Sequence, residues 1–117
     1  MIPAARPVRA AALRPPVADV TQRRILRALN ERSRYRYVKP EIAPEGEGWK
    51  ISSPCCSRRV DPEGGVIDIA WIEPIGQGWR LHARDHAQAR WQPVLDARRL
   101  QTLLERLRLD PFREFWK

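Results

Sequence analysis

The sequence predicts an α+β domain of two layers, in which an antiparallel meander of four or five short strands carries an N-terminal and a C-terminal helix packed on one face. Apolar residues recur with helical spacing near both ends of the chain and alternate with polar residues in between, where turns containing glycine and proline separate the runs. A chain of 117 residues suits one domain, which we expect over residues 19–117. No apolar run approaches the roughly 20 residues that cross a bilayer.

The first 18 residues differ in composition from the rest of the chain. They contain four of the 11 prolines, and no apolar period persists through them. We expect residues 1–18 to form a flexible basic arm. Their longest uncharged stretch, Met1–Ala5, is shorter than the roughly 7–15 apolar residues of a secretory signal. The expected location is therefore the cytoplasm, with no membrane association.

A first helix is predicted from Asp19 to about Arg32. Asp19 can accept hydrogen bonds from the free N–H groups of the first turn, and Gln22 three residues later completes a capping box. One narrow apolar stripe should rest on the sheet: Ile25, Leu26 and Leu29. The opposite face projects three basic side chains: Arg23, Arg24 and Arg27. Because the stripe is narrow, this helix needs a second layer to be stable.

The middle of the chain changes to a period of two, which is typical of strands. Five segments alternate or are apolar throughout, at 34–38, 49–52, 66–72, 79–84 and 90–94. Turn residues fill the intervals at 44–48, 74–78 and 85–89. The nearly continuous apolar run 66–72 predicts the central strand. Alternation places one set of side chains beneath the helices: Trp49, Ile51, Ile67, Ile69, Trp71, Trp79 and Leu81.

A second helix is predicted to begin at Asp96, a good N-cap residue, with Leu95 able to pack on Leu100 as a hydrophobic staple. Its apolar face is a stripe of four leucines: Leu100, Leu103, Leu104 and Leu107. Asp110-Pro111 should end this helix, because Pro111 has no N–H and crowds the preceding turn. At least one aromatic side chain of the tail should dock on the body: Phe112, Phe115 or Trp116.

The formal charge of +8 is concentrated at the front of the chain. Residues 1–36 carry nine arginines against two acidic residues, a net charge of +7, whereas residues 37–117 carry +1. This asymmetry favours a small non-enzymatic binding protein for an acidic partner, with nucleic acid ahead of an acidic protein. The predicted contacts are five arginines: Arg23, Arg24, Arg27, Arg34 and Arg36. A GC-rich genome would enrich arginine in the same way, so composition alone leaves both explanations open.

The predicted strands suggest a second basic surface, opposite the helices. Six basic side chains alternate there with apolar ones: Arg34, Arg36, Arg80, His82, Arg84 and Arg90. With an aromatic residue at its edge (Tyr35, Tyr37 or Trp91), such a face would suit single-stranded nucleic acid. Asp68 interrupts the central strand, and a carboxylate there should pair with a nearby arginine: Arg58, Arg80 or Arg84.

The segment 53–65 concentrates thiols, hydroxyls and two adjacent arginines, and four interpretations of it stay open. Cys55 or Cys56 could be a nucleophile whose thiolate the arginines stabilise, with His82 or His86 as the base. The same four side chains could hold zinc. The two cysteines could form a disulfide with each other, although nothing indicates an oxidising compartment. Finally, one thiol could fill the core while the other faces solvent.

Other signs of catalysis are missing from the sequence. It contains no phosphate-binding glycine loop, no catalytic serine motif and no dinucleotide fingerprint, so we expect neither enzymatic activity nor a cofactor. Three classes of function remain: nucleic-acid binding through the basic front end, a thiol or zinc site, and a protein–protein interaction module with an exposed aromatic edge.

Overall fold

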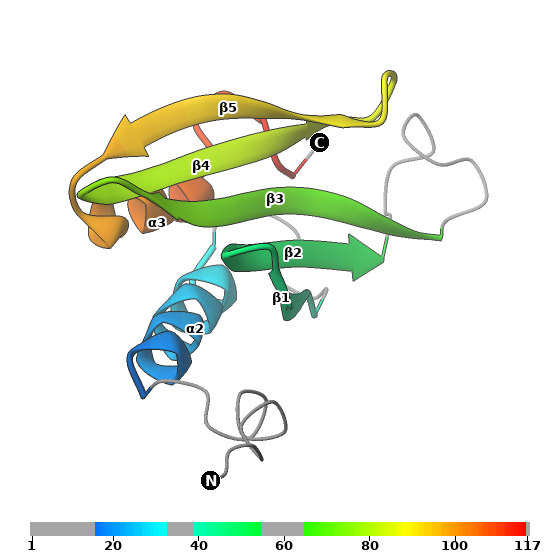
Figure 1. Cartoon of the computed structure of the whole chain (residues 1–117). Helices are drawn as coiled ribbons and strands as arrows, with labels where there is room; N and C mark the ends of the chain where they lie inside the picture. The colour runs from blue at the N-terminus through cyan, green and yellow to red at the C-terminus, as the bar shows by residue number, and fades with distance from the viewer. Residues whose placement is uncertain (1–15, 33–38, 55–64, 117) are drawn as a thin grey trace, which may run out of the picture.

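A computed structural model describes residues 16–32, 39–54 and 65–116 of the chain, and these form the α+β fold that the sequence predicts. One sheet contains five strands in the order β1-β2-β3-β4-β5, and every neighbouring pair is antiparallel (Figure 1). The elements are α2 (Pro16–Asn30), β1 (Glu41–Glu45), β2 (Gly48–Pro54), β3 (Val66–Ile75), β4 (Gly78–Asp85), β5 (Arg90–Ala97) and α3 (Leu100–Leu109). The predicted strand over 34–38 lies outside the described residues.

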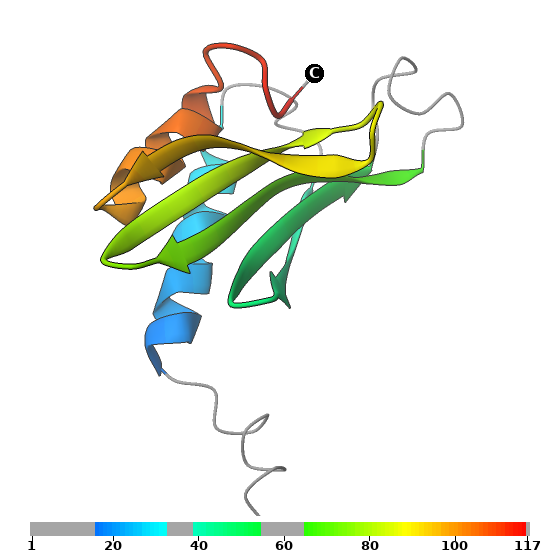
Figure 2. The same ribbon diagram turned by 45° about the horizontal axis from the view of Figure 1, so that its top comes forward.

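Both helices pack on the same face of the sheet, as predicted (Figure 2). The core between the layers is formed by Ile25, Ala28 and Leu29 of α2, the four leucines of α3, and Trp49, Ile51, Ile69, Ala70, Ile72, Leu81 and Ala83 of the strands. All four leucines of the predicted stripe in α3 are buried. The other face of the sheet has no layer over it among the described residues, and we call it the open face.

The side chains of β3 do not alternate strictly, and this overturns one prediction. The register between β2 and β3 shifts between Ile51 and Ser52, so that Ile69 has no partner in β2. Such a β-bulge adds one residue and inverts the phase of the strand beyond it. Ala70 and Ile72 therefore face the helices, while Trp71 points to the open face instead of the core.

The hairpins are tighter than the sequence predicts. The first turn contains Gly46 and Glu47, and the second contains Gly76 and Gln77, so the strands extend into the expected loops. Both glycines have positive φ values, 61° and 44°, which the first residue of a tight two-residue hairpin requires and which other residues adopt at a cost. β5 is also longer than predicted, because it continues to Ala97.

The first helix begins earlier than predicted, at Pro16 rather than Asp19. Proline suits the first turn of a helix, because its missing N–H would have no partner there. Asp19 therefore lies inside the helix, and residues 16–18 of the expected arm are helical, while residues 1–15 lie outside the described part. The buried stripe also shifts, since Leu26 is partly exposed while Thr21 and Ala28 are buried.

Asp96 is not the N-cap of the second helix. It belongs to β5, and α3 starts after Arg99, whose side chain makes no capping hydrogen bond. The helix ends at Asp110 as predicted, and this residue adopts the left-handed conformation. Among the described residues, neither helix is long and apolar enough to cross a membrane.

The tail after α3 folds back on the core, as expected, through two of its three aromatic residues. Phe115 and Trp116 are almost completely buried, whereas Phe112 is exposed. The buried Asp110 carboxylate holds this turn, because its oxygens accept hydrogen bonds from the backbone N–H groups of Glu114, Phe115 and Trp116. Arg32 also contacts the tail, because its guanidinium lies 4.6 Å from the centre of the Trp116 ring.

Candidate nucleic-acid interface

Three of the predicted contact residues lie on the exposed side of α2. Arg23, Arg24 and Arg27 are all exposed, as their position opposite the apolar stripe requires. Arg24 reaches across to the second helix, where its Nη2 donates a hydrogen bond to Gln101 Oε1 at 3.3 Å. This contact brings the middle of α2 beside the first turn of α3.

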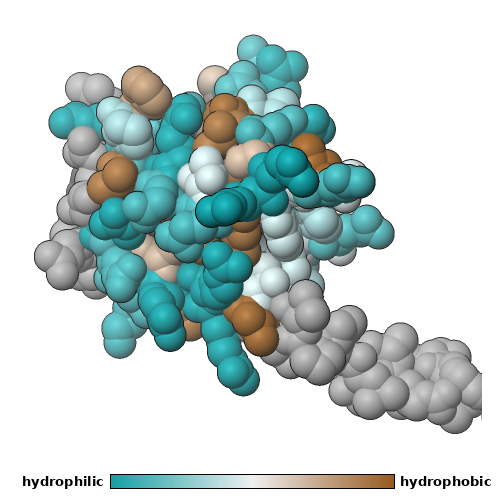
Figure 3. Space-filling model, turned by 90° about the vertical axis from the view of Figure 1, so that its left-hand side faces the viewer, coloured by the Kyte–Doolittle hydropathy of each residue, from teal (hydrophilic) through white to brown (hydrophobic). Residues whose placement is uncertain are grey.

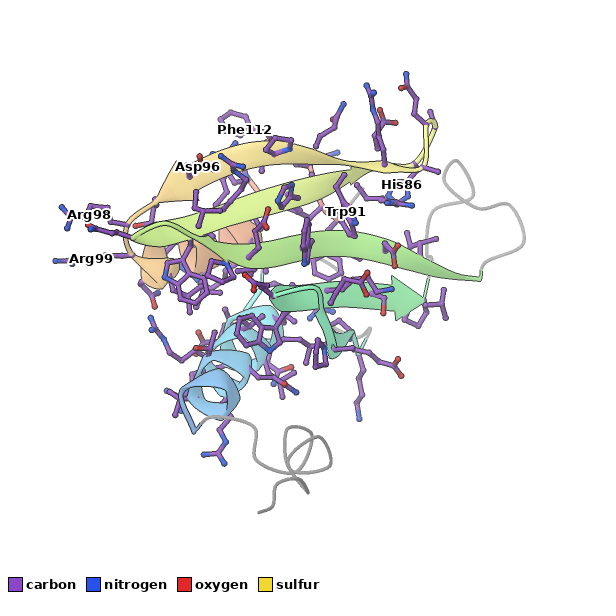
Figure 4. All side chains as sticks on the ribbon, viewed as in Figure 1. His86, Trp91, Asp96, Arg98, Arg99 and Phe112 are labelled. Atoms are coloured by element: carbon purple, nitrogen blue, oxygen red, sulfur yellow. The ribbon has the colours of Figure 1, made fainter. Side chains whose placement is uncertain are left out.

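The start of α3 adds two arginines that sequence reasoning missed. Arg98 and Arg99 are exposed, and Figure 4 shows both side chains projecting outward from the end of the molecule where α3 begins. Both arginines come directly before the turn of α3 that contacts α2 through Gln101, and Arg98 also lines a pocket with Asp96 and Gln77. The adjacent arginines at positions 98 and 99 are visible in the sequence. Their relation to the first helix follows only from the packing of α3 on α2. We call Arg23, Arg24, Arg27, Arg98 and Arg99 the arginine cluster.

The charges of the arginine cluster are not compensated within the described residues. None of the five arginines forms an ion pair there, whereas Arg80, Arg84, Arg90, Arg106 and Arg108 each lie within 4.0 Å of a carboxylate. The surface at this end of the molecule is largely hydrophilic (Figure 3). These guanidinium groups can bind an anion without first giving up a carboxylate partner.

Acidic residues also line the contact between the two helices, in addition to Asp19 in α2 and Asp96 beside Arg98. A groove of about 120 Å³ runs between α2 and α3, and it is lined by Arg24 and Arg27 together with Glu31, Glu105 and Arg108. Arg108 donates two hydrogen bonds to Glu105, which lower the pKa of that carboxyl. The lining of this groove thus combines three basic residues with two acidic ones, whereas the arginine cluster is basic throughout.

The open face differs, because its charges are paired. Arg80 donates from Nε and Nη2 to the two oxygens of Asp96, at 2.8 and 2.9 Å. These hydrogen bonds raise the pKa of Arg80 and lower the pKa of Asp96. Asp68 lies 3.6 Å from Lys50 Nζ and 3.9 Å from Arg84 Nε. The prediction of an arginine partner for Asp68 is thus confirmed in Arg84, with a lysine beside it.

Aromatic side chains occupy the centre of the open face. Trp71 stacks on His82 with ring centres 4.6 Å apart, and its indole N–H donates to the carbonyl oxygen of Glu45. Trp91 lies against Trp71 at 6.2 Å, and Arg84 sits over the Trp91 ring. His82 is buried beneath this group and bonds to Glu73 through Nε2. The face is therefore aromatic and charge-paired rather than basic.

The remaining candidate residues are separated or lie beyond what the structure describes. Arg34, Arg36, Cys55 and Cys56 are outside the described residues, as are Tyr35, Tyr37 and Arg58. His82 belongs to the open face, whereas His86 lies in the turn between β4 and β5 (Figure 4). Within the ranges described, no group of three or more metal-binding side chains comes together. The thiol and zinc interpretations thus stay predictions.

The fold and the charge distribution define a small α+β protein with one basic, helical layer and one open, aromatic sheet face. Residues 14–117 match the family described as "Domain of unknown function (DUF3024)", and the chain belongs to this family. Comparison with curated proteins and with solved structures finds no match to the chain.

Proposed function

We propose that this protein binds nucleic acid through the arginine cluster, without catalysing a reaction. The observation that carries the proposal is the gathering of five exposed arginines from two helices, none of which is ion-paired among the described residues. Arg34 and Arg36, which the sequence also predicts as contacts, lie outside the described residues, so the proposal rests on the arginine cluster.

The physical basis is the release of counterions from the phosphate backbone. Each arginine that neutralises a phosphate frees a condensed cation, so affinity falls steeply with salt concentration. No aromatic side chain belongs to the arginine cluster, so its contacts go to phosphates rather than to stacked bases. Binding should therefore depend weakly on nucleotide sequence, because phosphate contacts carry no direct sequence information.

The test is a binding titration of the full chain against a short DNA duplex at several salt concentrations. For the wild-type protein, the logarithm of the association constant should fall linearly with the logarithm of the salt concentration. The variant Arg23→Gln/Arg24→Gln/Arg27→Gln should bind more weakly at low salt. Its salt slope should decrease by about 2–3, since each lost phosphate contact removes roughly 0.9.

A matched control removes three positive charges from elsewhere on the surface. Lys39, Arg90 and Arg113 are exposed and lie outside the arginine cluster. Replacing all three by glutamine should reduce affinity less than the variant in α2, although the net charge changes equally. Equal losses in the two variants would mean that net charge alone governs binding. Absence of binding by the wild-type protein at low salt would contradict the proposal directly.

A further inference from the structure

The open face carries the residue types of a protein interface. Trp71 and Trp91 are half-buried on a sheet face that no described element covers, and Arg84 lies 4.9 Å from the centre of the Trp91 ring. Tryptophan and arginine are the residues most enriched among those that dominate binding energy at protein interfaces. The β-bulge at Ile69 directs Trp71 to this face instead of the core.

We infer that the open face is the contact surface of a homodimer, in which two copies pack sheet against sheet about a two-fold axis. The charges of the protein argue for a second copy as the partner. The chain carries a net charge of +8, so two copies repel each other unless they meet through a surface that is not positive. Over β2–β5 the open face has three basic residues and three acidic ones: Lys50, Arg80, Arg84, Asp68, Glu73 and Asp96.

The pairing within the face lowers the cost of covering it. Arg80 and Asp96 satisfy each other, and Asp68 lies between Lys50 and Arg84. Glu73 is hydrogen-bonded to the buried His82. Buried charges are most costly when they have no partner. A second copy that covers these groups leaves each of them with the partner it already has. β1 adds Glu41 and Glu45 at the edge of the face, and both are exposed in the single chain.

The dimensions of the sheet are sufficient for such a contact. Five strands about 4.8 Å apart and about eight residues long, at about 3.3 Å per residue, cover roughly 600 Å². Specific interfaces bury about 600–1,000 Å² on each partner, so most of the face must take part. A two-fold axis between the sheets turns the helical layer of each copy outward. Both arginine clusters thus remain free, and the dimer does not compete with the proposed nucleic-acid contact.

The test is sedimentation of the full chain in the absence of nucleic acid, so that its result is independent of the proposed function. The wild-type protein should change from a 13.6 kDa monomer to a species of twice that mass as its concentration is raised through the micromolar range. Trp91→Glu places a charge beside Trp71 on the open face and should raise the dissociation constant of the dimer by about thirty-fold or more.

Two further variants make the outcome decisive. Phe112→Glu changes an aromatic side chain that is 69% exposed but lies outside the open face, and it should dimerise like the wild type. Pro93 is exposed and lies opposite His82 in the register between β4 and β5. Pro93→Glu adds a charge to the open face there, and it should weaken dimerisation. This variant provides the test if Trp91→Glu does not fold. A wild-type monomer at every concentration would overturn the inference. So would association beyond two copies, because a two-fold contact closes at the dimer, or full dimerisation of a folded Trp91→Glu variant.

Discussion

The Asp110 carboxylate offers the most direct test of how the tail is held. Asp110 is completely buried, and its two oxygens accept from the N–H groups of Glu114 at 2.7 Å and Trp116 at 2.8 Å, with a longer contact to Phe115 at 3.3 Å. Its backbone has a φ of 44°, so the residue also bears the cost of a left-handed conformation. We predict that Asp110→Ala strongly destabilises the protein.

The magnitude follows from the number of donors that lose their acceptor. A hydrogen bond to a charged group contributes about 1.5–3 kcal/mol, and the variant loses two short bonds of this kind. Alanine also tolerates the left-handed region less well than aspartate, which adds about 1 kcal/mol. The free energy of unfolding should fall by about 4–7 kcal/mol, a large share of the 5–15 kcal/mol typical of small domains.

Urea unfolding at neutral pH, followed by tryptophan fluorescence and circular dichroism, measures this loss. Asp110→Gly serves as the matched control, because glycine removes the same carboxylate without the conformational cost. It should be about 1 kcal/mol more stable than Asp110→Ala, yet well below the wild type. If Asp110→Ala loses less than about 1 kcal/mol, the carboxylate does not hold the tail. If the glycine variant is as stable as the wild type, the conformation of residue 110 matters and its hydrogen bonds do not.

Two smaller predictions concern the second helix and the open face. Leu107→Ala should cost about 2–5 kcal/mol of unfolding free energy because Leu107 is fully buried, whereas Leu109→Ala, at a partly exposed position, should cost much less in the same urea assay. In an NMR titration, the pKa of Asp96 should lie below its ordinary value, because Arg80 donates hydrogen bonds to its carboxylate, and Arg80→Gln should raise it. The stabilisation from this pair is thus present above the ordinary pKa of aspartate and is lost as the pH falls through the lowered value. An unchanged Asp96 pKa in the Arg80→Gln variant would refute this cause.

The arrangement of the fold could be predicted because its main signals are local. Four leucines, each within about one turn of the next, define the buried face of α3, and the apolar run around Ile67–Ile72 identifies the central strand. Tight turns then allow only antiparallel neighbours. These patterns depend on residues a few positions apart, so no knowledge of the rest of the chain was needed.

Contacts between residues far apart in the sequence determine the features that local patterns do not predict. Asp96 has the chemistry of a helix cap, but β5 stays paired with β4 as far as Ala97, and Asp96 contacts Arg80 on the neighbouring strand. The arginine cluster could be predicted only for its part in α2, because Arg98 and Arg99 join it through the packing of the two helices. Trp71 was misplaced because a single unpaired residue in β3 has no signature in the alternation of its neighbours.

The bulge at Ile69 joins two half-strands of opposite phase, so the position of one unpaired residue decides which side chains of β3 face the helices. If Ile69 paired with Ile51 and no bulge formed, every residue beyond it would change faces, so that Trp71 would point toward the helices and Ile72 toward water. Deleting Ile69 would instead remove the extra residue, and Ala70, Trp71 and Ile72 would keep their present faces. The side chains that each face of the sheet presents therefore depend on the pairing of β2 with β3 as well as on the composition of β3.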